Sequence, residues 1–248
     1  MLLGFAAYKT HVASIILLCS TLLIVPLAAS GQKYSDFTTP RPLPPKSYLI
    51  IGVLGGIERW SATNRPVRQL AIALRDHDLR NVYTEWVEHR HRKLALRLIR
   101  ECLDTNGDGK LDEQERQSAR VILYGHSMGA ASVVSLAKSL NKLGVPVLLT
   151  VQVDSIGSGA AVIPPNVAKA ANFYQRNAII LHGRSEIRAQ DPTRTRILGN
   201  FKYDYRYKWV DLSSITLAER IAGGAHSKME FDPEVWSEVE KLILAEIK

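Results

Sequence analysis

From Tyr48 onward, the sequence alternates between short apolar runs and longer segments in which apolar residues recur every three or four positions. The apolar runs, each a predicted strand, are YLIIGVL (48–54), VYTEWVE (82–88), RVILYG (120–125), PVLLTVQV (146–153), AIILHG (178–183) and YKWVDL (207–212). The segments with helical period are RPVRQLAIALRDHD (65–78), HRKLALRLIRECL (91–103), AASVVSLAKSLNKLG (130–144), NVAKAANFYQR (166–176) and DPEVWSEVEKLILAEIK (232–248). Strands that take turns with helices pair in parallel through right-handed crossovers. The sequence therefore predicts an α/β fold, with a mostly parallel sheet of about six strands and helices on both faces.

The first thirty residues follow the pattern of a secretory signal peptide. Lys9 precedes a long apolar run, and the small residues 28–30 follow it. We expect export with cleavage after Ser30; the alternative is an uncleaved membrane anchor, because about eighteen apolar residues just span a bilayer. Residues 31–47 contain four prolines in TTPRPLPPKS and are expected to form a linker before a single domain at 48–248.

The formal net charge of +8 comes from basic residues that are scattered along the chain. A basic exported protein can associate with an anionic membrane or cell-wall surface. The chain shows no phosphate loop, no zinc-finger spacing and no aromatic-interleaved basic patch, so nucleic acid is not an expected partner. Removal of the leader leaves Cys102 as the single cysteine, which excludes an intrachain disulfide. We expect a monomer.

The sequence GHSMG at 125–129 lies between a predicted buried strand and a predicted helix. A serine on such a sharp strand-to-helix turn has a strained backbone, and the flanking glycines leave room where strand and helix nearly touch. Ser127 is therefore the candidate nucleophile. The backbone N–H of Met128 at the start of the helix is a candidate oxyanion donor. A second donor is expected from Gly55 and Gly56, in the loop after the first strand.

With this motif in this position, the chain from Tyr48 to Lys248 resembles the α/β-hydrolase superfamily, and within it the small lipase- and thioesterase-like branch. The resemblance implies the family's core without its first two strands, with the nucleophile after the third strand present. It also implies the chain order serine, acid, histidine and a base on the loop before the last helix. His226, in GGAHSKMEF, occupies that place.

The remaining histidines are weaker candidates for the base. His126 is expected to point away from the turn, and His182 ends a predicted strand, where a packing role and a site role are equally open. The others are assigned to the leader or to helical surface: His11, His77, His89 and His91.

The acid of the triad is open among three carboxylates. Asp154 ends the strand after the nucleophile helix, so it is expected at the same sheet edge as Ser127 and is preferred. The commoner family position is after the following predicted strand, where Glu186 and Asp191 are the alternatives.

The segment DTNGDGKLDEQE, at 104–115, fits the loop pattern of an EF-hand at every ligand position. It resembles an EF-hand calcium loop, with the helical segment 91–103 entering it. The expected ligands of one Ca²⁺ ion are Asp104, Asn106, Asp108, the carbonyl of Lys110, Asp112 and Glu115. The exiting helix is short and no second loop is present in the sequence, so a structural role for calcium is expected rather than a sensor role. The loop should lie at the opposite sheet edge from Ser127.

These features lead to one main hypothesis and one alternative. The main hypothesis is an exported, calcium-binding serine hydrolase that acts on a small-molecule or lipid-like ester or thioester through Ser127, His226 and Asp154. The alternative is a non-catalytic calcium-binding surface protein on a hydrolase-like scaffold.

Overall fold

The computed structural model describes residues 31–77, 79–178 and 181–247. The expected signal peptide, 1–30, lies outside this range. The packed unit begins at Gln32 and includes all the elements discussed below. Within the described residues, no helix has the length and apolar character needed to cross a membrane.

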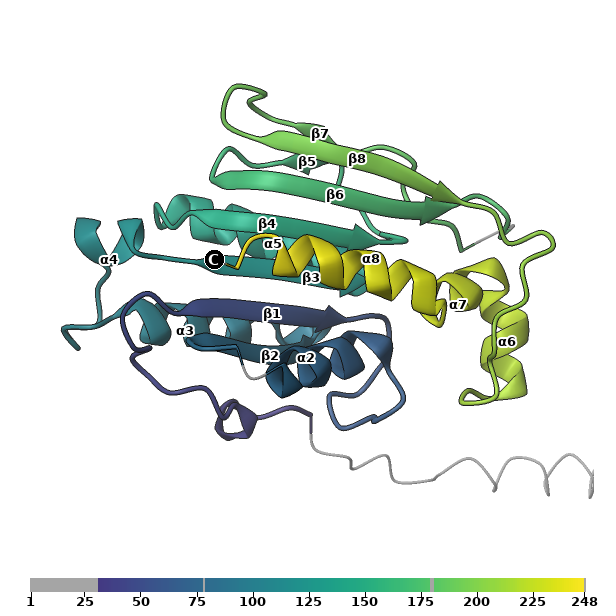
Figure 1. Ribbon diagram of the computed structural model, residues 1–248, viewed down its shortest axis with the longest axis horizontal. Coiled ribbons are helices and arrows are strands. Elements are labelled where there is room, and N and C mark those ends of the chain that lie inside the picture. Colours follow the sequence, from purple (N-terminus) through teal and green to yellow (C-terminus); the bar gives the residue numbers. More distant parts are fainter. Residues whose placement is uncertain (1–30, 78, 179–180, 248) are drawn as a thin grey trace, which may run out of the picture. The chain divides into compact units, whose positions relative to one another are not determined.

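The centre of the fold is a six-stranded sheet in the order β2-β1-β3-β4-β6-β8, shown in Figure 1. Its strands are β1 (Tyr48–Leu54), β2 (Val82–Glu88), β3 (Val121–His126), β4 (Val147–Val153), β6 (Val167–Gln175) and β8 (Arg196–Tyr203). Every neighbouring pair in it is parallel. The predicted α/β fold with about six strands is therefore confirmed, and its architecture agrees with an α/β-hydrolase-like core.

Successive residues of a strand point to opposite sides of the sheet. Because the central strands are apolar at successive positions, both faces of the sheet are covered by helices. On one face, Leu49 and Ile51 of β1 pack with α3 (Arg92–Leu103) and α5 (Met128–Lys142). On the other face, Ile50 packs with α2 (Pro66–Asp76) and α8 (Pro233–Leu244). Nearly continuous apolar runs in the central strands follow from this two-sided burial.

The part of the sheet formed by β6 and β8 differs from the prediction. Residues 166–176 were predicted to be a helix, but they contain the strand β6. The described parts of 178–183 and all of 207–212, which were predicted to be strands, contain no strand, and β8 was not predicted. In β6, Val167, Ala170 and Ala171 have the spacing of a helical stripe, but pairing with β4 on one side and β8 on the other determines the strand.

The proline-containing segment before β1 also differs from the expected linker. It packs against the domain: Phe37 and Leu43 are buried in the core, and Glu85 of β2 accepts hydrogen bonds from the backbone amides of Thr38 and Thr39. The remaining short elements are η1 (Tyr34–Asp36), η2 (His89–His91), α4 (Glu113–Gln117), β5 (Val162–Ile163), β7 (Arg188–Ala189), α6 (Leu217–Gly223) and α7 (Ala225–Glu230).

Candidate active site

Ser127 is the residue between β3 and α5. Its φ of 57° and ψ of −124° place it in a backbone conformation that non-glycine residues rarely adopt. Two backbone hydrogen bonds join this turn to the end of β4 and the loop after it. Ser127 N–H donates to the carbonyl of Val153 (2.9 Å), and the Ser127 carbonyl accepts from Ile156 N–H (3.2 Å). The strained turn therefore fixes the serine side chain at the carboxyl end of the sheet.

The two glycines of GHSMG are required by close backbone contacts. A Cβ atom at Gly129 would lie 2.1 Å from the carbonyl oxygen of Val53 and 2.6 Å from that of Leu54. A Cβ atom at Gly125 would lie 2.8 Å from the same Val53 oxygen. The nucleophile turn can therefore pack directly on the end of β1 only with glycine at both positions.

This contact predicts that Gly129→Ala lowers the free energy of unfolding by about 3 kcal/mol or more, because backbone atoms must move to admit the methyl group. Urea denaturation monitored by circular dichroism measures this change. Gly199→Ala is the matched control: there the new Cβ atom meets the Phe201 ring, which is partly exposed and can rotate away. Equal losses in the two variants would contradict the assigned contact.

Ser127, His226 and Asp154 form a continuous hydrogen-bonded chain. The Nε2 atom of His226 is 3.0 Å from Ser127 Oγ, and its Nδ1 atom is 2.6 Å from Asp154 Oδ2. The three side chains are nearly or fully buried, with 7%, 8% and 0% exposure for Ser127, His226 and Asp154. The geometry is that of a nucleophile, a base and an orienting acid. The structure thus brings together the three residues singled out in the sequence.

Asp154 is held by more donors than the sequence indicates. Its Oδ1 accepts from the backbone amides of Gly183 (2.6 Å) and Gln175 (3.3 Å), and its Oδ2 also accepts from Gln175 Nε2 (2.8 Å). Asp154 itself has a positive φ of 44°. Gln175 and Gly183 have no sequence signal that links them to Asp154, since the contacts depend on β6 lying beside β4.

The other acid and base candidates do not join this chain of contacts. The side chain of Asp191 accepts from Thr193 in its own turn, and Glu186 is exposed. The Nδ1 atom of His182 lies 2.8 Å from a guanidinium nitrogen of Arg176. Among the carboxylates of the described residues, Asp154 alone accepts a hydrogen bond from His226.

Burial lowers the pKa of His226, and the hydrogen bond to Asp154 opposes this effect without cancelling it. The imidazole is therefore neutral near pH 7. In that form, with Nδ1–H donated to Asp154, Nε2 is free to accept the hydroxyl proton of Ser127.

Backbone N–H groups next to Ser127 are available for a developing negative charge. The N–H of Met128 is in the first turn of α5, where no helical carbonyl can accept it. The backbone of Gly55 lies against Ser127, because a Cβ atom there would be 3.1 Å from Ser127 Cβ. Gly56 has open space around its α-carbon. Of the predicted oxyanion positions, Met128 thus follows Ser127 in the first turn of α5, Gly55 packs against Ser127, and Gly56 is the next residue of the same loop.

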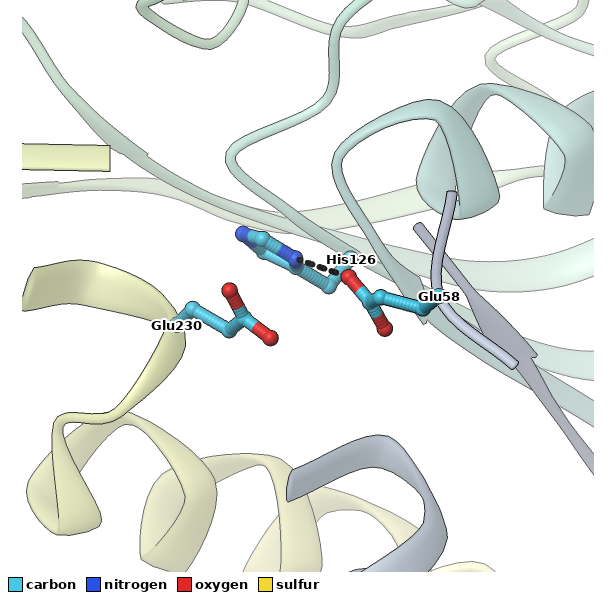
Figure 2. Close-up of side chains that lie close together, drawn as sticks. All are labelled: Glu58, His126 and Glu230. Carbon is cyan, nitrogen blue, oxygen red and sulfur yellow. Dashed lines mark ion pairs between the residues drawn. The ribbon is translucent and has the colours of Figure 1, made fainter. Parts of the chain in front are cut away.

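His126 differs from its expected orientation. Its ring is buried and stacks on the ring of His226, with centroids 4.7 Å apart and an interplanar angle of 27°. The Nδ1 atom of His126 is 3.7 Å from Glu58 Oε1, and Glu230 of α7 completes the cluster in Figure 2. Burial lowers the pKa of His126, but the negative charges of Glu230 and Glu58 outweigh it and raise that pKa overall.

Comparison with known proteins adds no assignment to this geometry. No protein-family model matches the sequence, and a search of curated proteins finds no relative. The functional argument therefore depends on the residues and contacts described for this chain.

The predicted calcium loop, 104–115, connects α3 to α4 and β3. Its side-chain oxygens accept from amides within the loop: Asp104 from Gly107 and Gly109, Asn106 from Asp108, and Asp108 from Lys110. The six expected ligand positions supply hard oxygens, the donor type that Ca²⁺ prefers. In the described residues, the carboxylates of this loop do not form a group of three or more whose oxygens all lie within 4.8 Å of one another. The donor chemistry of the loop therefore fits calcium, while its side-chain oxygens accept hydrogen bonds from amides of the loop itself.

Two of the expected ligands also have a local structural role. Asp112 and Glu115 form a reciprocal capping box at the start of α4, which is a short helix of 5 residues, as expected. The buried carboxylate of Glu115 further accepts from the amides of Thr105 and Asn106, so it links the two ends of the loop.

Proposed function

We propose that this protein is a serine hydrolase that cleaves an ester or thioester through Ser127, His226 and Asp154. The observation that carries the proposal is the hydrogen-bonded chain from Asp154 through His226 to Ser127 on a strained strand-to-helix turn. A serine in a purely structural turn needs neither a buried base nor an acid behind it. The leader supports export, and the resemblance to the α/β-hydrolase superfamily supports the same reaction class.

The contacts lead to a two-step reaction. His226 Nε2 takes the proton of Ser127 Oγ while the oxygen attacks the carbonyl carbon, and Asp154 stabilises the resulting imidazolium. The tetrahedral intermediate collapses when His226 gives that proton to the departing alcohol or thiol, which leaves an acyl group on Ser127. A water molecule, deprotonated by His226, then attacks the acyl carbon and releases the carboxylic acid.

The oxyanion is expected to bind to backbone amides. Met128 N–H is the first donor, since it projects from the N-terminus of α5 beside Ser127. The amide of Gly55 also supports the Glu58 carboxylate, which makes Gly56 the better second donor. Donors of this kind typically contribute about 10²–10³ to kcat each.

Exposed apolar side chains next to the nucleophile support an ester with an apolar acyl or alkyl group. Ile57, directly after Gly56, is 84% exposed, and Met128 is 44% exposed. Large exposed apolar side chains in the segments that adjoin Ser127 favour a substrate that covers them.

Turnover of 4-nitrophenyl esters and acyl thioesters of increasing chain length tests the reaction class. We expect measurable hydrolysis by the folded wild-type protein, with higher kcat/KM for medium or long acyl chains than for acetyl. If folded protein hydrolyses no member of the panel above the buffer rate, the proposed class is contradicted.

We further propose that the loop 104–115 binds one Ca²⁺ ion as a structural element. The loop and α4 precede the amino end of β3 and Ser127 follows its carboxyl end, so the six residues of this strand, about 20 Å, lie between the two. Calcium would therefore stabilise the connection between α3 and β3 without contacting substrate.

The calcium proposal predicts that chelation lowers the melting temperature. With Ca²⁺ at tenfold its dissociation constant, chelator should lower the Tm of wild type by about 3–6 °C. Differential scanning fluorimetry with and without EGTA measures the shift. Asp108→Ala should abolish the shift, whereas Asp211→Ala, which removes a similar exposed turn contact to Ser213, should retain it. Equal EGTA sensitivity in wild type and Asp108→Ala would contradict calcium binding by this loop.

A further inference from the structure

A second polar cluster, separate from the triad, consists of Glu58, His126 and Glu230. Their possible metal-ligating atoms all lie within 4.8 Å of one another. Figure 2 shows both carboxylates directed toward the His126 ring, Glu58 from the segment after β1 and Glu230 from α7. The three side chains are 9%, 1% and 6% exposed, so they are largely withdrawn from solvent.

The cluster lacks partners for several buried polar atoms. Neither ring nitrogen of His126 has a hydrogen-bond partner among the described residues, and Glu58 Oε2 has none either. Buried polar groups of this kind are nearly always paired, because an unpaired one costs free energy. These buried atoms, which lie close together, can therefore serve as ligands to a species bound between the three side chains.

The charges around the cluster point to a cation. Glu219 lies 2.6 Å from Arg65, and this pair is electrically neutral by itself. The second guanidinium nitrogen of Arg65 contacts Glu230 at 3.2 Å and holds that carboxylate in place. The single positive charge of Arg65 is thus shared by Glu219 and Glu230. With His126 neutral, as a metal ligand must be, the carboxylates of Glu58, Glu219 and Glu230 carry two more negative charges than Arg65 balances, and one divalent cation neutralises them.

We propose that Glu58, His126 and Glu230 bind one divalent transition-metal ion of the zinc class. An imidazole nitrogen with two carboxylates suits zinc, whereas Ca²⁺ and Mg²⁺ prefer sets made of oxygen alone. The 3.7 Å between His126 Nδ1 and Glu58 Oε1 is close to the ligand separation of about 3.4 Å around a tetrahedral zinc ion. Arg65 then supports a ligand from outside the coordination sphere, as is usual for ligating carboxylates.

The ligands would join the three segments that build the active site. Glu58 follows the glycine loop after β1, His126 directly precedes Ser127, and Glu230 is one helical turn beyond His226 on α7. A metal ion at this point would fix the relative positions of the oxyanion loop, the nucleophile and the base. It would do so without contacting the reacting atoms.

Metal analysis of the purified full-length chain tests the proposal, and it does not depend on hydrolase activity. We expect ~1 zinc per chain after purification without chelator or a metal-affinity step. In metal-stripped protein, Zn²⁺ at about a hundredfold its dissociation constant should raise Tm by about 5–10 °C. Glu58→Gln and Glu230→Gln should lose both effects.

Glu219→Gln is the matched control, because it removes the other carboxylate held by Arg65 but no proposed ligand; it should bind zinc as wild type does. If the ligand variants do not fold, Co²⁺ added to stripped wild type provides a second measurement, since tetrahedral cobalt absorbs strongly in the visible range. Absence of zinc together with no Tm shift and no cobalt band would overturn the proposal, and would assign the space to water or a protonated His126. Full zinc retention in Glu58→Gln and Glu230→Gln would also overturn it.

Discussion

Replacing Ser127 with alanine should lower kcat for ester hydrolysis by about 10⁶, the largest effect expected for any single substitution in this chain. In the proposed reaction the hydroxyl oxygen forms the acyl intermediate, and alanine leaves His226 with nothing to deprotonate. Residual turnover would come from bound water and the oxyanion donors alone. Initial rates on the best substrate of the 4-nitrophenyl panel measure the effect.

The matched control is Ser155→Ala, next to Asp154. Ser155 is also a buried serine, 2% exposed, and its hydroxyl has no hydrogen-bond partner among the described residues. Its replacement should leave kcat within about threefold of wild type, because among the described residues its hydroxyl makes no hydrogen bond to a group of the triad. A Ser127→Ala rate within an order of magnitude of wild type would show that another nucleophile carries the reaction.

Asp154→Asn should lower kcat/KM by about 10⁴ with the fold intact. Asparagine tolerates the positive φ at this position. Its carbonyl oxygen would take the place of Oδ1, which accepts the amides of Gly183 and Gln175. Its NH₂ group would then face His226 Nδ1, so the imidazole proton would move to Nε2. In that tautomer, Nε2 cannot accept the proton of Ser127.

Glu186→Gln and Asp191→Asn are the controls for the acid, since these carboxylates were the alternatives. Both should keep kcat/KM within about threefold of wild type, because neither side chain contacts His226. Circular dichroism and Tm of all three variants establish that a loss of rate is not a loss of fold. A loss of several orders of magnitude in Glu186→Gln, with Asp154→Asn near wild type, would reverse the assignment.

The fold was predictable where the local pattern and the tertiary environment agree. The strands β1, β2, β3 and β4 are apolar runs covered on both faces, so their sequences identified them. In β6, alanines with helical spacing pointed to the wrong element, because strand formation there depends on hydrogen bonding to β4 and β8. The strand β8 lies at the sheet edge with exposed polar residues, so it has no continuous apolar run.

In the candidate site, too, the features that depend on tertiary contacts could not be predicted from the local sequence. Ser127 follows from the turn motif and Asp154 from the end of a predicted strand, which are properties of short stretches, whereas His226 occupies the place that the resemblance to the α/β-hydrolase superfamily implies for the base. Gln175 contacts Asp154 only because β6 replaces the expected helix. The stacking of His126 on His226 joins residues that are 100 positions apart in the sequence, and the contact depends on how α7 packs against the carboxyl end of the sheet.

Reaction with a serine-directed fluorophosphonate is the most direct test of the account. The probe forms a covalent bond only with a serine activated by a neighbouring base, and intact-mass measurement counts the adducts. We expect ~1 adduct per folded wild-type chain, mapped by peptide sequencing to Ser127, and none in Ser127→Ala. Folded wild-type protein that acquires no adduct, or Ser127→Ala protein labelled as fully as wild type, would contradict the proposed catalytic role.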